Sequence, residues 1–288
     1  MSPGRARLRP APRPASMARR PATTTSEEGR VRLPNVLYGV YERRLARSLP
    51  AGTMPRHVGV ILDGNRRWAR SFGEPAATGH RRGADKIEEF LGWSEELGIE
   101  VVTLWMLSTD NLGRPASELQ DLLDIINDAV DELADTGERT GRWRLRVMGR
   151  LDLLPAATAG ALREAEARTA GVTDGLQVNV AVGYGGRHEI ADAVRDLLRS
   201  RAAEGATLEE VADDLDVEHI QAHLYTKGQP DPELLIRTSG EQRLSGFLLW
   251  QSAQSEFYFC EAYWPDFRRV DYLRALRAYS TRERRLGK

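Results

Sequence analysis

The chain has 288 residues, 41 basic and 42 acidic side chains, and a hydrophobic content of 41%. It contains no apolar run of the ~18 residues that a membrane-spanning helix needs, and its charged fraction is typical of a folded, soluble domain. Composition therefore excludes a membrane-spanning protein, a mainly disordered chain and a uniform polycation. The single cysteine, Cys260, can form neither an internal disulfide nor a thiolate metal site, which suits a reducing cytoplasm.

The net charge of −1 hides a division of the chain, because residues 1–50 carry +8 and residues 51–288 carry −9. Residues 1–30 are rich in Pro, Arg and Ala and lack the apolar core of a signal peptide, so they predict a disordered basic tail, with Met17 as an alternative start. Residues 31–50 predict a short basic amphipathic helix. That helix either packs on the domain or docks on an anionic membrane surface.

From residue 51 onward, apolar runs alternate with amphipathic helical patterns. The predicted strands are 57–63, 101–107, 143–148, 176–182 and 234–236, and the helical patterns are 83–97, 116–136, 155–168 and 187–203. This alternation predicts one α/β domain over residues 51–288, with a mostly parallel central sheet flanked by helices on both faces. The ligand site of such a sheet lies at the carboxyl ends of its strands.

Polar residues follow four of the predicted strands, in the segments 63–68, 108–111, 183–187 and 237–245. A glycine followed by polar residues that open a helix brings unpaired backbone N–H groups and the positive end of the helix dipole to one point, which suits an anion. Arg67, Arg237 and Arg243 add guanidinium groups that fit phosphate oxygens. The sequence therefore predicts phosphate sites at these strand ends.

Asp63 ends the first predicted strand and would face the same pocket. Its carboxylate would be repelled by phosphate oxygens unless a cation lay between them, so it predicts Mg²⁺ held by a carboxylate together with substrate phosphate. The alternative is that Asp63 only caps the following helix.

Five blocks of residues occur in order over roughly residues 50–288. They are Asp63-Gly64-Asn65-x-Arg67-Trp68-Ala69; Gly79-His80; Ser108-Thr109-Asp110-Asn111-x-x-Arg114-Pro115 with Glu118; Arg237-Thr238-Ser239-Gly240-Glu241-x-Arg243-x-Ser245-x-Phe247-Leu248-Leu249-Trp250-Gln251; and Glu256-Phe257-Tyr258-Phe259 with Trp264-Pro265-Asp266-Phe267. These blocks resemble the cis-prenyltransferases, the isoprenyl diphosphate synthases that include undecaprenyl diphosphate synthase. The resemblance implies that family's α/β fold and not the all-α fold of the trans-prenyltransferases.

The resemblance also implies an activity. The family joins isopentenyl diphosphate to an allylic diphosphate, forms a cis double bond, releases pyrophosphate and requires Mg²⁺. By position, Asp63 and Glu256 would bind Mg²⁺, and Asp63 would also assist departure of the allylic diphosphate. Asn111 is the family's candidate for proton removal, and a pyrophosphate oxygen is the alternative acceptor. The substrate-binding positions would be Gly64, Asn65, Arg66, Arg67, Trp68, His80, Ser108, Thr109, Asp110, Arg114, Glu118, Arg237, Arg243, Leu244, Ser245 and Gly287.

Three positions depart from the family pattern. Ala76 stands where many members have an arginine on the allylic diphosphate, so that contact is either missing or supplied by Arg81 or Arg82. Met106 stands where long-chain bacterial members have alanine, and its larger side chain would shorten the product tunnel. With Leu112 in place of a tryptophan, it resembles the short-chain actinobacterial type that makes (2Z,6E)-farnesyl diphosphate from geranyl diphosphate. A long-chain decaprenyl or undecaprenyl diphosphate synthase is the alternative.

Other classes of protein fit less well. A haloacid-dehalogenase-type phosphatase needs a second aspartate where Asn65 stands, and a noncatalytic partner subunit would lack Asp63 and several of the arginines. The resemblance implies a homodimer in which the Arg285-Leu286-Gly287 tail reaches the neighbour's active site. No nucleic-acid-binding motif is present. We expect a cytoplasmic protein, with the N-terminal helix as its point of peripheral membrane contact.

Overall fold

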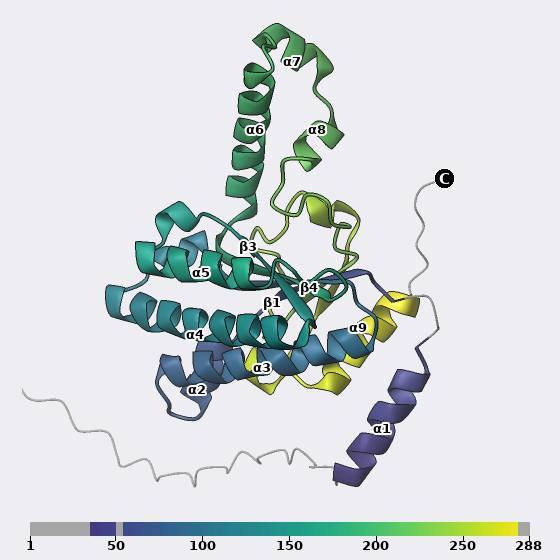
Figure 1. Ribbon diagram of the computed structural model, residues 1–288. Helices are drawn as coiled ribbons and strands as arrows, with labels where there is room; N and C mark the ends of the chain where they lie inside the picture. Colours follow the sequence, from purple (N-terminus) through teal and green to yellow (C-terminus); the bar gives the residue numbers. More distant parts are fainter. Residues whose placement is uncertain (1–34, 50–53, 282–288) are drawn as a thin grey trace, which may run out of the picture.

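The computed structural model describes residues 35–49 and 54–281 (Figure 1). In this part of the chain, six parallel strands form one sheet in the order β3-β4-β2-β1-β5-β6. The strands are β1 (His57–Ile61), β2 (Val101–Ser108), β3 (Trp143–Met148), β4 (Leu176–Tyr184), β5 (Leu234–Arg237) and β6 (Glu256–Phe259). The predicted α/β class with a parallel sheet is confirmed, and β6 is a strand that the sequence pattern did not predict.

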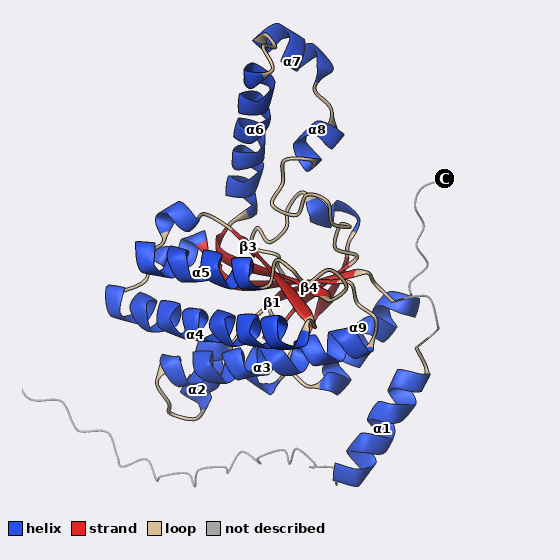
Figure 2. Ribbon diagram, in the orientation of Figure 1, coloured by secondary structure: helices blue, strands red, loops and turns tan. Residues whose placement is uncertain are grey.

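Helices surround the sheet unevenly (Figure 2). Those of the main body are α2 (Asn65–Ser71), α3 (Ala76–Glu96), α4 (Ala116–Thr140), α5 (Ala156–Arg168) and α9 (Arg269–Thr281). Short 3₁₀ turns are η1 (Thr109–Gly113), η2 (Leu151–Leu153), η3 (Gln251–Gln254) and η4 (Trp264–Asp266). In Figure 1, α6 (Gly186–Ala203) runs away from the sheet and the chain returns through α7 (Leu208–Asp214) and α8 (Val217–Gln221), which together form a projecting arm.

The two faces of the sheet pack against different partners. Val60, Leu104 and Val180 belong to the main core, which also contains buried residues of α3, α4, α5 and α9. On the opposite face, Ile61 and Trp105 belong to a second cluster with Phe247 and Leu248, and the Trp105 and Phe247 rings stack 5.2 Å apart. The predicted sheet flanked by helices is confirmed, and on this second face Leu244, Phe247 and Leu248 also pack against the strands.

Helix α3 begins seven residues before the predicted pattern at 83–97 because two glycines let it approach α2 closely. A Cβ atom on Gly79 would lie 2.1 Å from the Asn65 carbonyl oxygen, and one on Gly83 would lie 2.4 Å from Asn65 Oδ1. Any side chain at these positions would separate the two helices. The close approach sets α2, with its arginines, against the first turns of α3.

Helix α1 (Asn35–Arg47) lies inside the predicted range 31–50 and packs on α9. Its Leu45 is buried against Val270 and Leu273, and Arg269 Nε lies 3.5 Å from a carboxylate oxygen of Glu42. The predicted tail 1–30 and the C-terminal Gly287 lie outside the described residues. Within the described ranges, no helix is both long enough and apolar enough to cross a membrane.

Candidate active site

A cavity of about 570 Å³ opens at the carboxyl ends of β1, β2 and β5. Parallel strands bring their carboxyl ends to one edge, so the polar segments that follow them meet there. The predicted site residues that line the cavity are Asp63, Gly64, Asn65, Arg66, Arg67, His80, Met106, Ser108, Asp110, Asn111, Arg114, Arg237, Arg243 and Ser245.

Asp63 is fixed at the centre of this edge by the neighbouring strand. Ile61 of β1 is paired with Arg237 of β5, and Arg237 Nη2 donates to Asp63 Oδ2 at 2.8 Å. The Thr238 hydroxyl donates to the Asp63 carbonyl oxygen at 2.7 Å. Gly64 then turns the chain with a φ of 102°, a left-handed conformation that glycine adopts without strain. This turn points the start of α2 at the cavity.

The charge state of Asp63 follows from two opposing effects. Burial alone would raise the pKa of its carboxyl group, but the hydrogen bond and positive charge of Arg237, with smaller contributions from Ser239 and Arg67, lower the pKa overall. Asp63 is therefore ionised at neutral pH, as a metal ligand must be.

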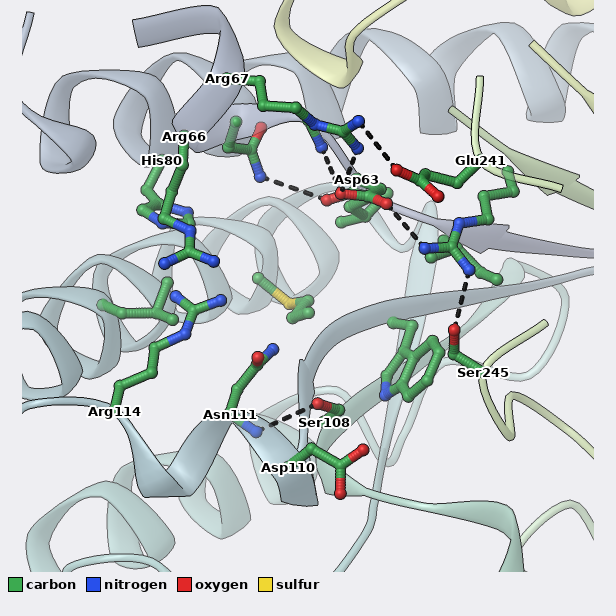
Figure 3. A pocket seen from close by; sticks show the side chains of 18 of the residues that line it. Asp63, Arg66, Arg67, His80, Ser108, Asp110, Asn111, Arg114, Glu241 and Ser245 are labelled. Carbon is green, nitrogen blue, oxygen red and sulfur yellow. Dashed lines mark hydrogen bonds and ion pairs between the residues drawn. The ribbon is translucent and has the colours of Figure 1, made fainter. Parts of the chain in front are cut away.

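Three guanidinium groups contact Asp63 or Glu241, and Figure 3 shows Arg67 pointing toward both carboxylates. Arg67 of α2 donates from Nη1 to Glu241 Oε1 at 3.0 Å and from Nη2 to the Ser239 hydroxyl at 2.6 Å. Arg237 donates to the Ser245 hydroxyl at 2.9 Å, and Arg243 forms an ion pair with Glu241. Glu241 was not among the predicted site residues, although its place between Arg237 and Arg243 in one polar segment was a usable signal.

A second basic group lies across the cavity from Asp63, as Figure 3 shows. Arg66 and Arg114 both contact Glu118 Oε1, at 3.2 and 3.3 Å. Burial lowers the pKa of His80 to about 4, and the positive charges of Arg114 and Arg66 add to the effect, so His80 is neutral at pH 7. Its Nε2 atom is buried and has no hydrogen-bond partner among the described residues, which leaves it free to contact a ligand.

The structure also shows which arginines could supply the contact that Ala76 lacks. Arg81 and Arg82 are exposed on α3 and do not line the cavity, so the expected replacement by either of them is not supported. Arg70, which was not predicted, does line it. Arg70 and Arg66 are thus basic side chains of α2 that line the cavity in addition to Arg67.

Asn111 reaches the cavity from η1. The Ser108 hydroxyl accepts a hydrogen bond from the Asn111 backbone N–H at 3.2 Å, which caps the turn that follows β2. The Asn111 side chain lies at the cavity wall, between Ser108 and Arg114 in Figure 3.

Several predicted residues do not line the cavity. Glu118 supports Arg66 and Arg114, Trp68 packs its ring 4.9 Å from Phe72, and Thr109 begins η1. Leu112 and Leu244 are half-buried and pack against the two hydrophobic clusters.

Glu256 lies far from Asp63 within this chain. It is the first residue of β6 and pairs with Leu234, which in turn pairs with Val58. Asp63 follows Val58 by five positions, which amounts to ~17 Å along a strand at ~3.3 Å per residue. One chain therefore does not bring the two predicted carboxylate ligands together.

Asp63 nevertheless fits the role of a magnesium ligand. In the described part of the chain, no group of three or more His, Cys, Asp or Glu side chains could hold a metal ion. Mg²⁺ is usually bound by one or two carboxylates plus substrate phosphate oxygens and water, and does not require a cage made of protein ligands. A single ionised carboxylate at the wall of an arginine-rich cavity meets that requirement.

A small apolar cavity of about 30 Å³ adjoins the main one between α3 and α4. The two cavities share Leu62, Asn65, His80, Met106 and Leu122. Met106 thus stands where the polar cavity passes into the apolar one. A hydrocarbon chain that entered from the polar cavity would meet this residue.

Comparison with known proteins decides the family. A family described as "Putative undecaprenyl diphosphate synthase" matches residues 61–287. The chain belongs to this family, the cis-prenyltransferases. It is 62% identical to a (2Z,6E)-farnesyl diphosphate synthase from Thermobifida fusca over 260 residues, 90% of this chain and 99% of the relative. It is 54% identical to a short-chain Z-isoprenyl diphosphate synthase from Mycobacterium leprae over 260 residues, 89% of this chain and 98% of the relative.

A solved structure agrees with this assignment. Lavandulyl diphosphate synthase from Lavandula x intermedia, crystallised with dimethylallyl diphosphate, matches with a TM-score of 0.76 and 34% identity, covering 82% of this chain and 99% of that one. The predicted family, fold and prenyltransferase activity are therefore confirmed. This cis-prenyltransferase carries its arginines at the carboxyl edge of the sheet, where the sequence placed them.

Proposed function

We propose that this cis-prenyltransferase condenses isopentenyl diphosphate with an allylic diphosphate to give a short-chain Z-prenyl diphosphate, with Mg²⁺ required and pyrophosphate released. The observation that carries the proposal is one cavity that collects Arg67, Arg237 and Arg243 around the ionised Asp63. Two diphosphates need several fixed cations, and the pyrophosphate that leaves needs positive charge on its oxygens as the carbon–oxygen bond breaks. The cluster supplies both.

The two diphosphates have separate places in this proposal. The allylic diphosphate binds at the start of α2, on the backbone of Gly64 to Arg67 and on the Arg67 guanidinium, with Arg66, Arg114 and His80 opposite. Isopentenyl diphosphate binds to Arg237, Arg243 and Ser245, where Arg237 already donates to the Ser245 hydroxyl. Both places open into one cavity, so the reacting carbons would be held close together.

Asp63 is the residue of this chain that would hold Mg²⁺, in company with phosphate oxygens. A bound Mg²⁺ would stabilise the negative charge that develops on the leaving pyrophosphate. Glu256 is not included in this proposal, because it lies at the amino end of β6, whereas Asp63 lies at the carboxyl edge of the sheet. Removal of divalent cations with a chelator should therefore abolish turnover, and added Mg²⁺ should restore it.

The proton lost during condensation needs an acceptor. Asn111 lines the cavity, but a neutral amide is a weak base. We assign Asn111 the task of orienting substrate by hydrogen bonding, with Ser108 fixing its turn. A pyrophosphate oxygen is then the acceptor, because it is the more basic group in the cavity.

Product length would be limited at Met106. The apolar cavity beyond the polar one holds only about 30 Å³, so Met106 leaves little room for a hydrocarbon chain to extend past it. The names of the relatives from Thermobifida fusca and Mycobacterium leprae agree with a short product. Geranyl diphosphate is accordingly the allylic substrate that we propose, and a long-chain synthase is the alternative.

Product analysis tests the proposal. The purified chain is incubated with radiolabelled isopentenyl diphosphate, Mg²⁺ and dimethylallyl, geranyl or farnesyl diphosphate, and the dephosphorylated products are separated by thin-layer chromatography. We expect a product of farnesyl length from geranyl diphosphate. A main product of decaprenyl or undecaprenyl length would overturn the short-chain proposal, and no turnover by the chain alone would favour a noncatalytic subunit.

The assembly that we propose is a homodimer. The projecting arm exposes Leu208, Leu215 and Val217, of which Leu208 is 71% exposed. Exposed apolar residues that gather on one projection are typical of a surface that another chain covers. Light scattering coupled to size-exclusion chromatography should give twice the mass of the chain.

We also propose a cytoplasmic location with peripheral membrane contact through α1. Its buried face already packs on α9, so such contact would depend on its exposed Arg43 and Arg44 and on anionic lipid. Sedimentation with vesicles that contain or lack phosphatidylserine would measure it, and equal sedimentation with both would exclude charge-dependent binding.

A further inference from the structure

The arginines proposed to bind the two diphosphates are all paired with carboxylates already. Arg237 donates to Asp63 at 2.8 Å, and Arg67 Nη2 lies 3.4 Å from Asp63 Oδ1. Arg67 Nη1 also lies 3.0 Å from Glu241 Oε1, and Arg243 forms an ion pair with Glu241 Oε2. Two carboxylates of the protein therefore satisfy three guanidinium groups, and Figure 3 shows Arg67 in contact with both carboxylates.

Glu241 is placed in the cavity by an unusual piece of backbone. Ser239 and Gly240, which precede it, have φ values of 79° and 75°, so two successive left-handed residues reverse the chain after β5. A left-handed serine is strained, and such strain persists only where the surrounding contacts hold it. The Ser239 backbone N–H donates to the Ala262 carbonyl oxygen at 2.7 Å, and the Ser239 hydroxyl accepts from Arg67. The reversal brings Glu241 back between Arg67 and Arg243.

Glu241 differs from the other carboxylate that joins two arginines in this site. Glu118 contacts Arg66 and Arg114 but does not line the cavity, so a ligand could bind those arginines without displacing it. Glu241 does line the cavity, and each of its two oxygens contacts one arginine. A phosphate oxygen that bound the same guanidinium N–H groups would have to take the place of a Glu241 oxygen.

We propose that Glu241 is a positioning residue that occupies the place of diphosphate oxygens in the empty site and is displaced when the substrates bind. The inference rests on the proposed function, in which Arg67 receives the allylic diphosphate and Arg243 receives isopentenyl diphosphate. Before substrate arrives, Glu241 pairs with Arg67 and Arg243 and offsets the repulsion between their positive charges. The side chain of Arg243 is 63% exposed, so without such a partner it would sample many rotamers and would have to be ordered when substrate binds.

Displacement of one residue from two arginines links the two substrates. The first diphosphate to bind takes one arginine from Glu241, so the carboxylate loses one of its two partners and its hold on the other arginine weakens. The second diphosphate then displaces a carboxylate that is less firmly held. Such coupling is reciprocal, so either substrate would favour the other. It opposes the repulsion between two bound anions.

Inorganic pyrophosphate is the probe that separates this role from a structural one. Isothermal titration calorimetry measures its affinity for the full chain and for Glu241→Gln, in the presence of a chelator so that only protein cations bind it. The variant keeps the size of the side chain but removes the competing charge. We expect Glu241→Gln to bind pyrophosphate roughly tenfold more tightly, because a charge-assisted hydrogen bond no longer has to be broken.

A matched control removes the same charge elsewhere. Glu95 pairs with Arg142 on the surface, with Arg142 Nε 2.9 Å from Glu95 Oε2, and neither residue lines the main cavity. Glu95→Gln should leave the affinity for pyrophosphate at the wild-type value. If Glu241→Gln does not fold, as judged by thermal unfolding, Glu241→Asp serves instead, because its shorter side chain cannot reach both arginines and should also bind pyrophosphate more tightly.

Affinity in the Glu241 variant that equals or falls below the wild-type value would overturn the inference, as would an equal gain in Glu95→Gln. These outcomes leave the proposed function intact if the wild-type chain still elongates geranyl diphosphate. Absence of turnover in the wild-type chain would instead contradict the proposed function, whatever the calorimetry gives.

Discussion

Met106 is the residue at which the proposed product length can be tested most directly. It lines both the polar cavity and the small apolar cavity. Met106→Ala would remove the end of a flexible side chain and enlarge the apolar cavity by the freed volume, at a cost in folding stability of about 2 kcal/mol. We expect products longer than those of the wild-type enzyme by at least one isoprene unit, measured by chromatography of the dephosphorylated alcohols.

The matched control for this change is Leu112→Ala. Leu112 was predicted to share the control of chain length, but it packs against the core and lines neither cavity. Its truncation should leave the product length unchanged. If Leu112→Ala lengthens the product and Met106→Ala does not, the tunnel ends elsewhere than the structure indicates.

At the scale of single residues, the sequence predicted which charged side chains line the site better than it predicted which side chains those residues contact. Asp63, Arg67 and Arg237 follow strands, and parallel strands deliver such residues to one edge. Glu256 was placed beside Asp63 on resemblance alone, whereas strand register puts it at the amino end of β6. Glu241 was missed because its position depends on two left-handed residues, and backbone reversal of that kind is not encoded in a hydrophobic pattern.

At the scale of elements, a buried polar network joins three central strands. The His57 ring of β1 donates from Nδ1 to the Pro230 carbonyl oxygen at 2.8 Å, and its Nε2 accepts from the Thr103 hydroxyl of β2 at 2.8 Å. Asn179 of β4 donates to the Thr103 oxygen at 2.9 Å. A proton added to Nε2 would force the Thr103 hydroxyl to give up its role as donor. The network therefore requires neutral His57.

This network predicts a pH-dependent stability. Burial lowers the pKa of His57 from 6.5 to about 4, so the folded protein binds fewer protons than the unfolded chain between these pH values. Stability from this group is present above pH 6.5 and is lost as the pH falls toward 4, by roughly 3 kcal/mol in all. Urea unfolding of wild type and His57→Asn at a series of pH values measures the difference.

The wild type and the His57→Asn variant should differ in how steeply the free energy of unfolding changes with pH, and not only in its value at one pH. The His57→Asn variant should lose less free energy of unfolding between pH 6.5 and pH 4 than the wild type. Part of the loss should remain, because burial also lowers the pKa of His80 to about 4. Identical slopes in the two proteins would mean that His57 titrates normally in the folded state.

Elements with strong local patterns were the ones that sequence could predict. The apolar runs that became β1, β2, β4 and β5 are almost entirely buried, as expected for inner strands of a parallel sheet. The run that became the edge strand β3 is only partly buried and is exposed at Arg144. The edge strand β6 was missed because its residues are only half-buried and do not form an apolar run. The start of α3 was missed because Gly79 and Gly83 weaken the local helix signal, although the approach of α2 requires them.

At the scale of the whole molecule, the position of the site follows from the order of the strands. The chain passes from β1 to β2 and on to β3 and β4 on one side, then returns to place β5 and β6 on the other side of β1. The chain leaves β1 toward β2 on one side and leaves the neighbouring β5 toward β6 on the other, which opens a crevice between the carboxyl ends of β1 and β5. Asp63 and Arg237 meet there although 174 positions separate them.

The proposed dimer can be tested through the C-terminal residues, which we expect from the family resemblance to reach the active site of the neighbouring subunit. Asp63→Asn should be inactive but keep its own tail, whereas a chain that lacks residues 284–288 should keep its active site but bind isopentenyl diphosphate poorly. A mixed dimer would supply the truncated subunit with a tail from its partner. Refolding the two inactive chains together should therefore restore roughly a quarter of the wild-type activity per subunit, since half the dimers are mixed and each has one complete site.

The control for this complementation is the same mixture made with an Asp63→Asn chain that also lacks residues 284–288. No tail is then present, and no activity should return. Activity that stays at the level of the separate variants in the first mixture, while light scattering shows mixed dimers, would mean that each tail serves the site of its own chain. For the tail of one subunit to enter the site of the other, the subunits must associate, for which the arm offers exposed Leu208 and Leu215. The site must also be open to solvent on one side, as the cavity at the sheet edge is.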